Sequence, residues 1–166
     1  MAYKEHIQPE ILPISPTLRL RKYDGHYEVF LQGYQDPFVY QNSEGIFDES
    51  KIPTLDYVKG MCNYLAKAGE LYYIEILEDG HFVPVGDVTL KEENPPIAIW
   101  RGGCRGKGIG KQVMLAIINR LRELGCKKIT DSTVYRWNTA SQHLHESLGF
   151  RKANENEREL FYDLDL

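Results

Sequence analysis

Along this chain, segments in which hydrophobic residues repeat with the period of a strand are followed by segments in which they repeat with the period of a helix. Residues 17–23 alternate apolar and polar side chains, which is typical of a half-buried strand. Residues 27–40 are rich in aromatic side chains, and we expect part of this segment to be helical. Thr54 stands where it can cap a helix whose apolar residues repeat at helical spacing as far as Gly69.

The middle of the chain predicts strands around a tight turn. Residues 71–77 and 82–90 flank a four-residue turn and predict an antiparallel hairpin. Residues 97–100 form a short apolar run, as expected of a buried central strand. A stretch rich in glycine and cations, residues 101–112, follows directly.

In the last third of the chain, segments with helical spacing of apolar residues alternate with segments that resemble strands. Residues 113–124 predict a helix, residues 126–135 a strand, and residues 138–148 a second helix. The final residues, 159–166, alternate again as a terminal strand. This order of elements indicates an α/β (α+β) sheet domain.

Composition narrows the class of protein. The 166 residues (19.2 kDa) suit a single domain, 1–166, and the net charge of −4 argues against a nucleic-acid partner. Three separate cysteines without CxxC spacing predict neither a disulfide framework nor a metal site. We find no apolar export segment at the N-terminus and no apolar run of about 18 residues, so we expect no membrane partner and a cytoplasmic location.

The glycine-rich stretch excludes two familiar phosphate loops. A Walker A loop would need glycine where Arg105 stands and serine or threonine where Gln112 stands. A dinucleotide fingerprint would need its third glycine at Lys111 or Val113. The pattern that remains is R-x-x-G-x-G between a strand and a helix, where backbone amides and a helix N-terminus can bind a pyrophosphate.

A second motif follows one strand later, and it changes the interpretation. Residues 138–150 read NTASQHLHESLGF. Together the two motifs resemble the GNAT superfamily of acyl-CoA-dependent N-acyltransferases. The matching residues are Arg105, Gly108, Gly110, Asn138, Ser141, Leu144, Gly149 and Phe150. The resemblance implies a mixed, mostly antiparallel central sheet of six to seven strands, splayed between strands four and five and flanked by about four helices.

The resemblance also implies a cofactor, acetyl-CoA, and the residues that bind it. Seven residues would surround the pyrophosphate: Arg105, Gly106, Lys107, Gly108, Ile109, Gly110 and Lys111. The backbone near Ile99 and Trp100 would pair with the pantetheine amides, and Asn138 would hydrogen-bond the same arm. Ser141 would pack closely against the cofactor.

Acetyl transfer to an amine requires a proton for the departing thiolate. Where the family often has a tyrosine, this chain has His145, which can donate a proton near neutral pH. A branch that acetylates ribosomal-protein N-termini and similar amines can use a serine, and Ser141 stands at that position. The residues leave both candidates open.

The transfer also requires a neutral amine, and the base is less defined. Thr133 replaces a glutamate that some relatives use. Strand alternation places Asp131 and Tyr135 on one face, so Asp131 is a candidate base acting through water and Tyr135 a wall or donor. Asp87, Glu75 and a water chain are further options.

The acceptor side is expected to come from the N-terminal half. Residues 27–49 combine aromatic side chains with several acids, which suits a cationic amine; the acids include Glu28, Asp36, Glu44, Asp48 and Glu49. The acceptor is either a small polyamine or aminoglycoside-like molecule, or the N-terminus or a lysine of a protein. A catalytically silent CoA-binding module is the alternative to an enzyme, and family analogy leaves a homodimer open.

Overall fold

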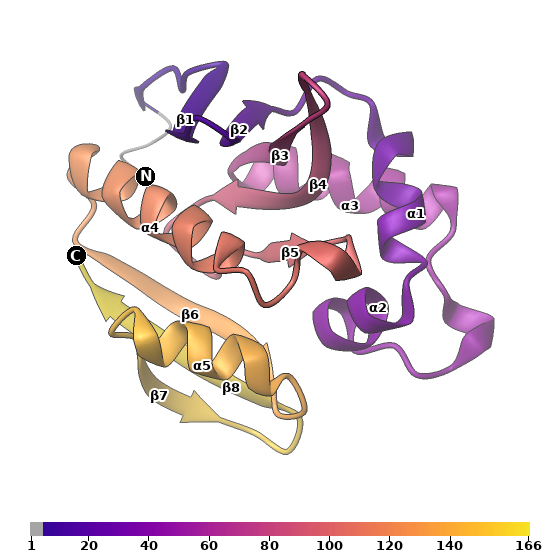
Figure 1. Ribbon diagram of the computed structural model, residues 1–166. Coiled ribbons are helices and arrows are strands. Elements are labelled where there is room, and N and C mark those ends of the chain that lie inside the picture. Colours follow the sequence, from indigo (N-terminus) through magenta and orange to yellow (C-terminus); the bar gives the residue numbers. More distant parts are fainter. Residues whose placement is uncertain (1–4) are drawn as a thin grey trace.

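A computed structural model describes residues 5–166 of the chain (Figure 1). Residues 1–4 lie outside the described residues. They belong to the N-terminal stretch in which we find no apolar export segment. The strands are β1 (Ile11–Ser15), β2 (Leu18–Lys22), β3 (Glu70–Glu78), β4 (His81–Leu90), β5 (Ile97–Ile99), β6 (Lys128–Tyr135), β7 (Arg151–Glu155) and β8 (Glu159–Asp165). The α-helices are α1 (Leu31–Tyr34), α2 (Pro37–Glu44), α3 (Leu55–Ala68), α4 (Ile109–Glu123) and α5 (Thr139–Ser147).

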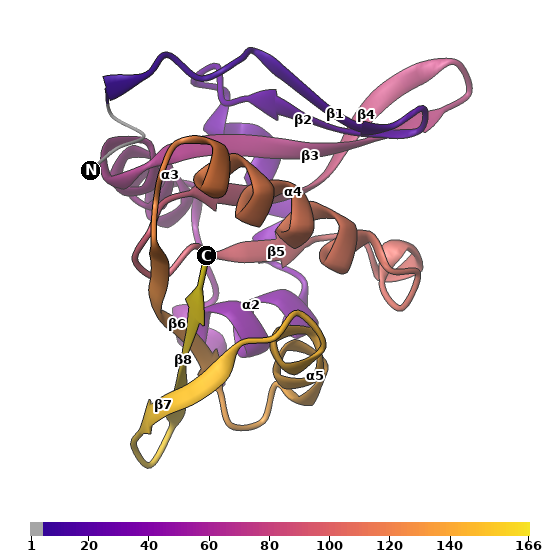
Figure 2. The same ribbon diagram turned by 90° about the vertical axis from the view of Figure 1, so that its left-hand side faces the viewer.

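The strands form two sheets that separate between β5 and β6. One sheet has the order β1-β2-β3-β4-β5 and the other β6-β8-β7, and every ladder between the named strands is antiparallel. An isolated parallel bridge between Glu93 and Thr130 links the two. Figure 2 shows the second sheet turned away from the first. The expected splay between the fourth and fifth predicted strands, here β5 and β6, is confirmed.

The described chain has more strands than the six to seven expected. The additional strands β1 and β7 are edge strands of their sheets. All five residues of β7 are exposed, and the apolar residues of β1 (ILPIS) do not alternate with polar ones, so neither segment has the sequence pattern that predicts a half-buried strand. Five α-helices stand in place of about four, because the expected helical part of residues 27–40 divides into the single turn α1 and the helix α2.

Strand β3 shows why the first sheet is covered on both faces. Leu71 and Tyr73 are buried with residues of α1 and α3, whereas Tyr72 and Ile74 are buried with residues of α4. Successive side chains of a strand point to opposite faces, so one apolar run requires helices on both sides. Helix α4 thus covers one face and helices α1 and α3 pack against the other.

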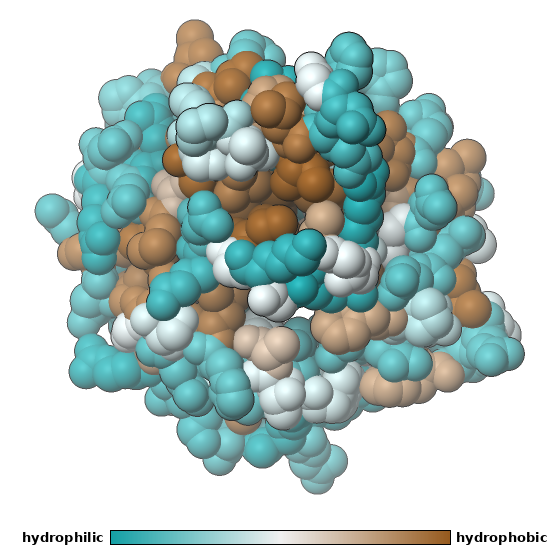
Figure 3. Space-filling model, viewed as in Figure 1, coloured by the Kyte–Doolittle hydropathy of each residue, from teal (hydrophilic) through white to brown (hydrophobic). Residues whose placement is uncertain are grey.

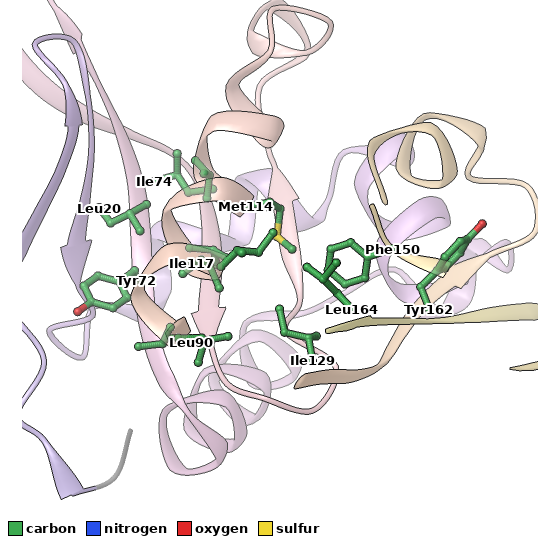
Figure 4. Packing of buried hydrophobic residues seen from close by; sticks show 14 of the residues in the cluster. Leu20, Tyr72, Ile74, Leu90, Met114, Ile117, Ile129, Phe150, Tyr162 and Leu164 are labelled. Carbon is green, nitrogen blue, oxygen red and sulfur yellow. The ribbon is translucent and has the colours of Figure 1, made fainter. Parts of the chain in front are cut away.

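Helix α4 connects the two sheets through one apolar core. Met114 and Ile117 are fully buried and lie between Ile74 of the first sheet and Leu164 of the second (Figure 4). This packing fixes the position of α4 relative to both sheets. Among the described helices, none is long and apolar enough to cross a membrane.

Candidate active site

The glycine-rich loop leads into the first turn of α4, whose backbone N–H groups are not bound by a capping side chain of residues 5–166. Gly106 and Gly108 have φ angles of +72° and +78°, in the left-handed region that favours glycine. Gly108 immediately precedes α4, and no described side chain caps the helix there. The first N–H groups of α4 can therefore bind an anion, with the positive end of the helix dipole behind them.

The guanidinium of Arg105, a predicted pyrophosphate-binding residue, has partners within the fold. Its guanidinium donates from Nε to the Ile99 carbonyl at 3.2 Å and from Nη2 to the Trp100 carbonyl at 2.9 Å. The guanidinium also lies 4.1 Å from the Phe38 ring centroid and 3.6 Å from a carboxylate oxygen of Asp36. Arg105 therefore ties the loop to β5 and α2 while it also lines the cleft.

The exposed edge of β5 offers backbone groups, although not all those predicted. The Trp100 N–H donates to the Val85 carbonyl and its carbonyl accepts from Arg105, while the indole Nε1 donates to buried Asp87 at 2.8 Å. Trp100 thus does not fit the predicted contact with a pantetheine arm. In an antiparallel ladder with Ala98 opposite Asp87, the N–H groups of Ile97 and Ile99 point away from β4.

These elements enclose a hollow that we call the glycine-loop cleft, with a cavity volume of about 440 Å³. Its lining residues come from α2, β5, the loop, α4 and α5. They include Phe38, Val39, Asn42, Ser43, Ile97, Ala98, Ile99, Cys104, Arg105, Gly106, Gly108, Ile109, Gly110, Lys111, Asn138, Ala140, Ser141, His143, Leu144 and Ser147. Lys111 is an exposed cation on its rim, whereas Lys107 is exposed but not part of the lining. Figure 3 shows apolar residues gathered around a hollow near the centre of this face, ringed by hydrophilic ones.

A second hollow of about 340 Å³ adjoins the cleft, and we call it the Glu44 cavity. It is bounded by α2, α3, the segment after β4, β6 and the start of α5. Its lining residues include Tyr34, Glu44, Met61, Tyr64, Leu65, Lys91, Asn94, Ser132, Thr133, Tyr135, His145 and Glu159. Six further residues line both hollows: Asn42, Ser43, Ile97, Ala98, Asn138 and Ser141. The two hollows therefore meet between α2, β5 and α5.

The start of α5 forms this junction. Asn138 caps the helix, accepting through Oδ1 from the Ser141 N–H at 3.2 Å, and donates through Nδ2 to the Asn42 carbonyl at 3.4 Å. The neighbouring Trp137 Nε1 donates to the Gln41 carbonyl at 2.9 Å. These bonds hold the end of α2 against the start of α5. The structure thereby places Asn138 and Ser141 at the junction, and their contacts with a cofactor stay predictions.

His145 is buried, being only 3% exposed, and both of its ring nitrogens have partners. Nδ1 lies 2.7 Å from the Ser141 carbonyl oxygen, which can only accept, so Nδ1 carries the proton. Nε2 lies 2.8 Å from Ser132 Oγ and therefore accepts from this hydroxyl. Burial lowers the pKa of His145. A neutral imidazole with both nitrogens engaged does not fit the predicted proton donor, whereas the Ser141 hydroxyl lies at the junction.

Strand β6 departs from the alternation that made Asp131 a candidate base. The ladder with β8 shifts register between Ile129 and Ser132, and Asp131 has a φ angle of +53°. This bulge leaves Asp131 exposed, with its N–H donating to Asp163 Oδ1 at 3.0 Å, and outside the lining of both hollows. The predicted shared face of Asp131 and Tyr135 is wrong, because one extra residue reverses the side-chain alternation. Tyr135 does line the Glu44 cavity.

The other acids named as possible bases occupy structural positions. Glu75 is 3% exposed and bonds Arg19 and Arg21 at 2.8 and 3.0 Å. Asp87 is 1% exposed and accepts from Tyr34 Oη and Trp100 Nε1. Burial raises the pKa of Asp87 to about 7, against the opposing effect of these two hydrogen bonds. Asp87 does not line the Glu44 cavity itself. It is connected to the cavity through its hydrogen bond with Tyr34, which does line it.

Glu44 was singled out only as one of several acids in the N-terminal half. At the end of α2 it lines the cavity and accepts from Tyr57 Oη at 2.6 Å. Burial raises the pKa of Glu44, although the Tyr57 hydrogen bond opposes the rise. Ser132 is a second residue that the sequence missed, since the bulge turns it inward. Within residues 5–166, no group of three or more histidines, cysteines or acids is placed to hold a metal ion.

Comparison with known proteins identifies relatives of this arrangement. The L-2,4-diaminobutyric acid acetyltransferase of Streptomyces coelicolor is 33% identical over 96 residues, which span 53% of this chain and 56% of that protein. A domain from Methanocaldococcus jannaschii superposes with a TM-score of 0.76 at 21% identity, covering 90% of this chain and 98% of the domain. The ribosomal L7/L12 alpha-N-protein acetyltransferase RimL, solved with coenzyme A, has a TM-score of 0.67 at 15% identity, covering 95% and 98%.

A family model settles the membership. Residues 34–150 match the model of the acetyltransferase (GNAT) family. This range includes both motifs, and it begins well upstream of the first of them. Since the match spans more than half of the 166 residues, this chain belongs to the GNAT acetyltransferase family.

Proposed function

We propose that this protein is an N-acetyltransferase that transfers the acetyl group of acetyl-CoA directly to a primary amine while both are bound. The observation that carries the proposal is the shared wall of the two hollows, with Ser141 and Asn138 at their junction. A donor in the glycine-loop cleft and an amine in the Glu44 cavity would meet there. Holding two reactants side by side supplies a large part of a bimolecular rate enhancement.

The glycine-loop cleft has the features that coenzyme A needs. The uncapped start of α4 suits a pyrophosphate, and the free N–H groups of Ile97 and Ile99 suit amide carbonyls of the pantetheine arm. Lys111 adds positive charge at the rim. Support also comes from RimL, a structural neighbour solved with coenzyme A.

Glu44 is the group we propose as general base. When bound, acetyl-CoA supplies an activated thioester, and the attacking amine must arrive without its extra proton. The raised pKa of Glu44 brings this carboxylate closer to the working pH of a base. Its negative charge also attracts the cationic form of the amine into the cavity. In the transfer the N–C bond forms, the C–S bond breaks, and Glu44 takes the amine proton directly or through water.

Ser141 is the group we propose to protonate the departing sulfur. Its hydroxyl lies at the junction, and it regains the donated proton from solvent. His145 acts as a positioning residue: its Nδ1–H holds the Ser141 carbonyl and its Nε2 holds Ser132. The proposed site therefore has a carboxylate base, Glu44, on the side of the amine and a neutral proton donor, Ser141, on the side of the sulfur.

A small amine is the acceptor that fits the cavity. About 340 Å³ lies at the low end of volumes that hold small molecules. Aromatic and acidic residues line it, including Tyr34, Tyr135, Glu44 and Glu159, which suits an ammonium group. A relative named for a small diamino acid agrees with this choice.

The test combines acetyl-CoA binding by calorimetry with thiol release across a panel of amines. Gly108→Ala and Gly108→Glu form a matched pair, because both place a side chain at the same left-handed φ, where a Cβ meets nothing within 4 Å. Only the glutamate brings a negative charge to the pyrophosphate, so we expect its acetyl-CoA affinity to fall at least about tenfold below that of Gly108→Ala.

Two results would contradict the proposal in different ways. Equal affinities of the two Gly108 variants would remove the loop from the cofactor site. Tight acetyl-CoA binding without thiol release on any amine would favour a silent CoA-binding module over an enzyme.

A further inference from the structure

A buried lysine forms part of the Glu44 cavity wall. Lys91 directly follows β4, is 9% exposed, and lines the cavity beside Met61, Tyr64 and Leu65 of α3. Neither Lys91 nor any residue of α3 lines the glycine-loop cleft. The lysine therefore belongs to a wall distinct from the junction at which the acetyl group would be transferred.

The ammonium of Lys91 lacks a counter-ion in contact. Among the side-chain hydrogen bonds and ion pairs of residues 5–166, none involves this ammonium, although the charge of Glu93 acts on it and the Tyr64 ring centroid lies 5.8 Å from Nζ. Burial lowers the pKa of Lys91. The residue is largely buried, yet Nζ is not among the fully buried polar atoms of the described residues that lack a partner, so a ligand anion in the cavity could reach this unpaired ammonium and replace its lost hydration.

The remaining charges of the cavity have the opposite sign. Glu44 and Glu159 line the same space as Lys91, so two carboxylates and one ammonium face a ligand. A plain diamine would set positive charge against Lys91, and a monoamine would leave it unpaired. A molecule with two ammonium groups and one carboxylate complements all three side chains.

We propose that the acceptor is a small diamino acid whose carboxylate binds Lys91. One amine would face the junction at Ser141 and Asn138, with Glu44 as its base, and the other would pair with Glu159. This inference rests on the proposed acetyltransferase function and adds the substrate class and a specificity-determining residue. Its direct consequence is that the enzyme distinguishes a diamino acid from the same molecule without its carboxylate.

The probe is a pair of amines that differ only in that group, 2,4-diaminobutyrate and 1,3-diaminopropane. We compare kcat/KM for both in the wild type, Lys91→Met, Lys91→Arg and Lys67→Met. Lys67 is the matched control, since it is an exposed lysine of α3 outside both hollows. Thermal melts confirm that each variant is folded.

The preference for 2,4-diaminobutyrate over 1,3-diaminopropane is expected to fall about 10- to 100-fold in Lys91→Met, the usual effect of losing a charged hydrogen bond. Lys91→Arg retains more of this preference, and Lys67→Met retains all of it. A preference that stays within about threefold of wild type in Lys91→Met overturns the inference while leaving the acetyltransferase proposal intact.

A binding measurement separates the two levels of failure. If the wild type releases no thiol with either amine, the proposed function is wrong for these acceptors. Calorimetric titration with 2,4-diaminobutyrate then decides the inference alone. Binding that weakens at least about tenfold in Lys91→Met supports a carboxylate site, and absence of binding to the wild type overturns it.

Discussion

At the scale of single residues, function depends on what surrounds each titratable group. Glu44 and Asp131 are both acids within the family match, yet only Glu44 is desolvated and lines the cavity. His145 and Ser141 both follow the motif asparagine, yet the histidine is committed to Ser132 and to a backbone carbonyl. Burial and hydrogen-bond partners thus choose between candidates that residue type leaves equal.

Glu44→Gln tests the proposed base. We expect kcat near pH 7 to fall about 10²- to 10⁴-fold, since an amide cannot accept the amine proton. The raised pKa of Glu44 predicts a rising limb of kcat/KM above its ordinary value of 4.5, and the variant should lack that limb. Glu49→Gln is the control, because Glu49 is exposed and lines neither hollow. Steady-state rates within about threefold of wild type would exclude Glu44 as the base.

Ser141→Ala tests the proposed proton donor to sulfur. We expect kcat to fall about 10²-fold where chemistry limits turnover, because the thiolate would leave without a positioned donor. Thr139→Ala serves as the control, since Thr139 is exposed on the same helix and lines neither hollow. Single-turnover kinetics provide the measurement, and an unchanged rate in Ser141→Ala would assign the proton to water.

At the scale of elements, short irregularities decide which side chains and backbone groups of a strand or helix face the two hollows. The bulge in β6 reverses the side-chain alternation, so that Ser132 turns inward and Asp131 outward. The left-handed glycines before α4 free its first turn from side-chain caps. Both devices are departures of one or two residues from regular geometry, and each redirects groups that a regular element would hold differently.

The bulge makes a prediction about Asp131. Asparagine tolerates the left-handed region and keeps the donated N–H, so Asp131→Asn should leave kcat/KM within about twofold. Valine is β-branched and strained at a φ of +53°, so Asp131→Val should lower the free energy of unfolding by about 1–2 kcal/mol. Urea unfolding measures the second effect. A large loss of kcat in folded Asp131→Asn would instead restore Asp131 to the active site.

At the scale of the whole molecule, long-range contacts assemble the site. Asp87 of β4 joins Tyr34 of α1 to Trp100 after β5, and Asn138 joins α5 to the end of α2. Along the sequence, Asp87 is 53 positions from Tyr34 and 13 from Trp100. Asn138 is 96 positions from its partner Asn42. The acceptor wall therefore depends on packing between segments that are distant along the chain.

Asp87 should leave a signature in the pH dependence of stability. The pKa of Asp87 is about 7 in the folded chain against 3.8 for the ordinary group, so between these values the folded state holds a proton that the unfolded state has lost. The free energy of unfolding contributed by this group therefore falls as pH rises from about 4 to 7, by up to about 1.4 kcal/mol per pH unit.

Asp87→Asn isolates this contribution. His145, whose pKa is lowered, acts in the opposite direction below about 6.5, because its unfolded form binds a proton first. The difference between wild type and Asp87→Asn cancels the histidine, and we expect the variant to gain stability relative to wild type between pH 5 and 8. Parallel pH profiles from denaturant unfolding would mean that Asp87 is ionised throughout.

The sequence by itself determined the order of most elements and the location of the two GNAT motifs. Helix α3 begins after Thr54, whose Oγ1 accepts from the Tyr57 N–H at 3.2 Å, and it ends at Gly69 as expected. The β3–β4 hairpin and α4 likewise follow their predicted bounds within a few residues. These features depend on caps, turns and periodicity, which act between residues only a few positions apart.

Only the tertiary structure decided which side chains face the two hollows. Arg105 turns back onto carbonyls of Ile99 and Trp100, Glu44 approaches from the far end of α2, and Lys91 is buried against α3. Exposed edge strands such as β7 were missed for the same reason, since their pairing leaves no local apolar pattern. Desolvation and long-range contact depend on segments that meet only when the chain has folded, and local sequence does not record them.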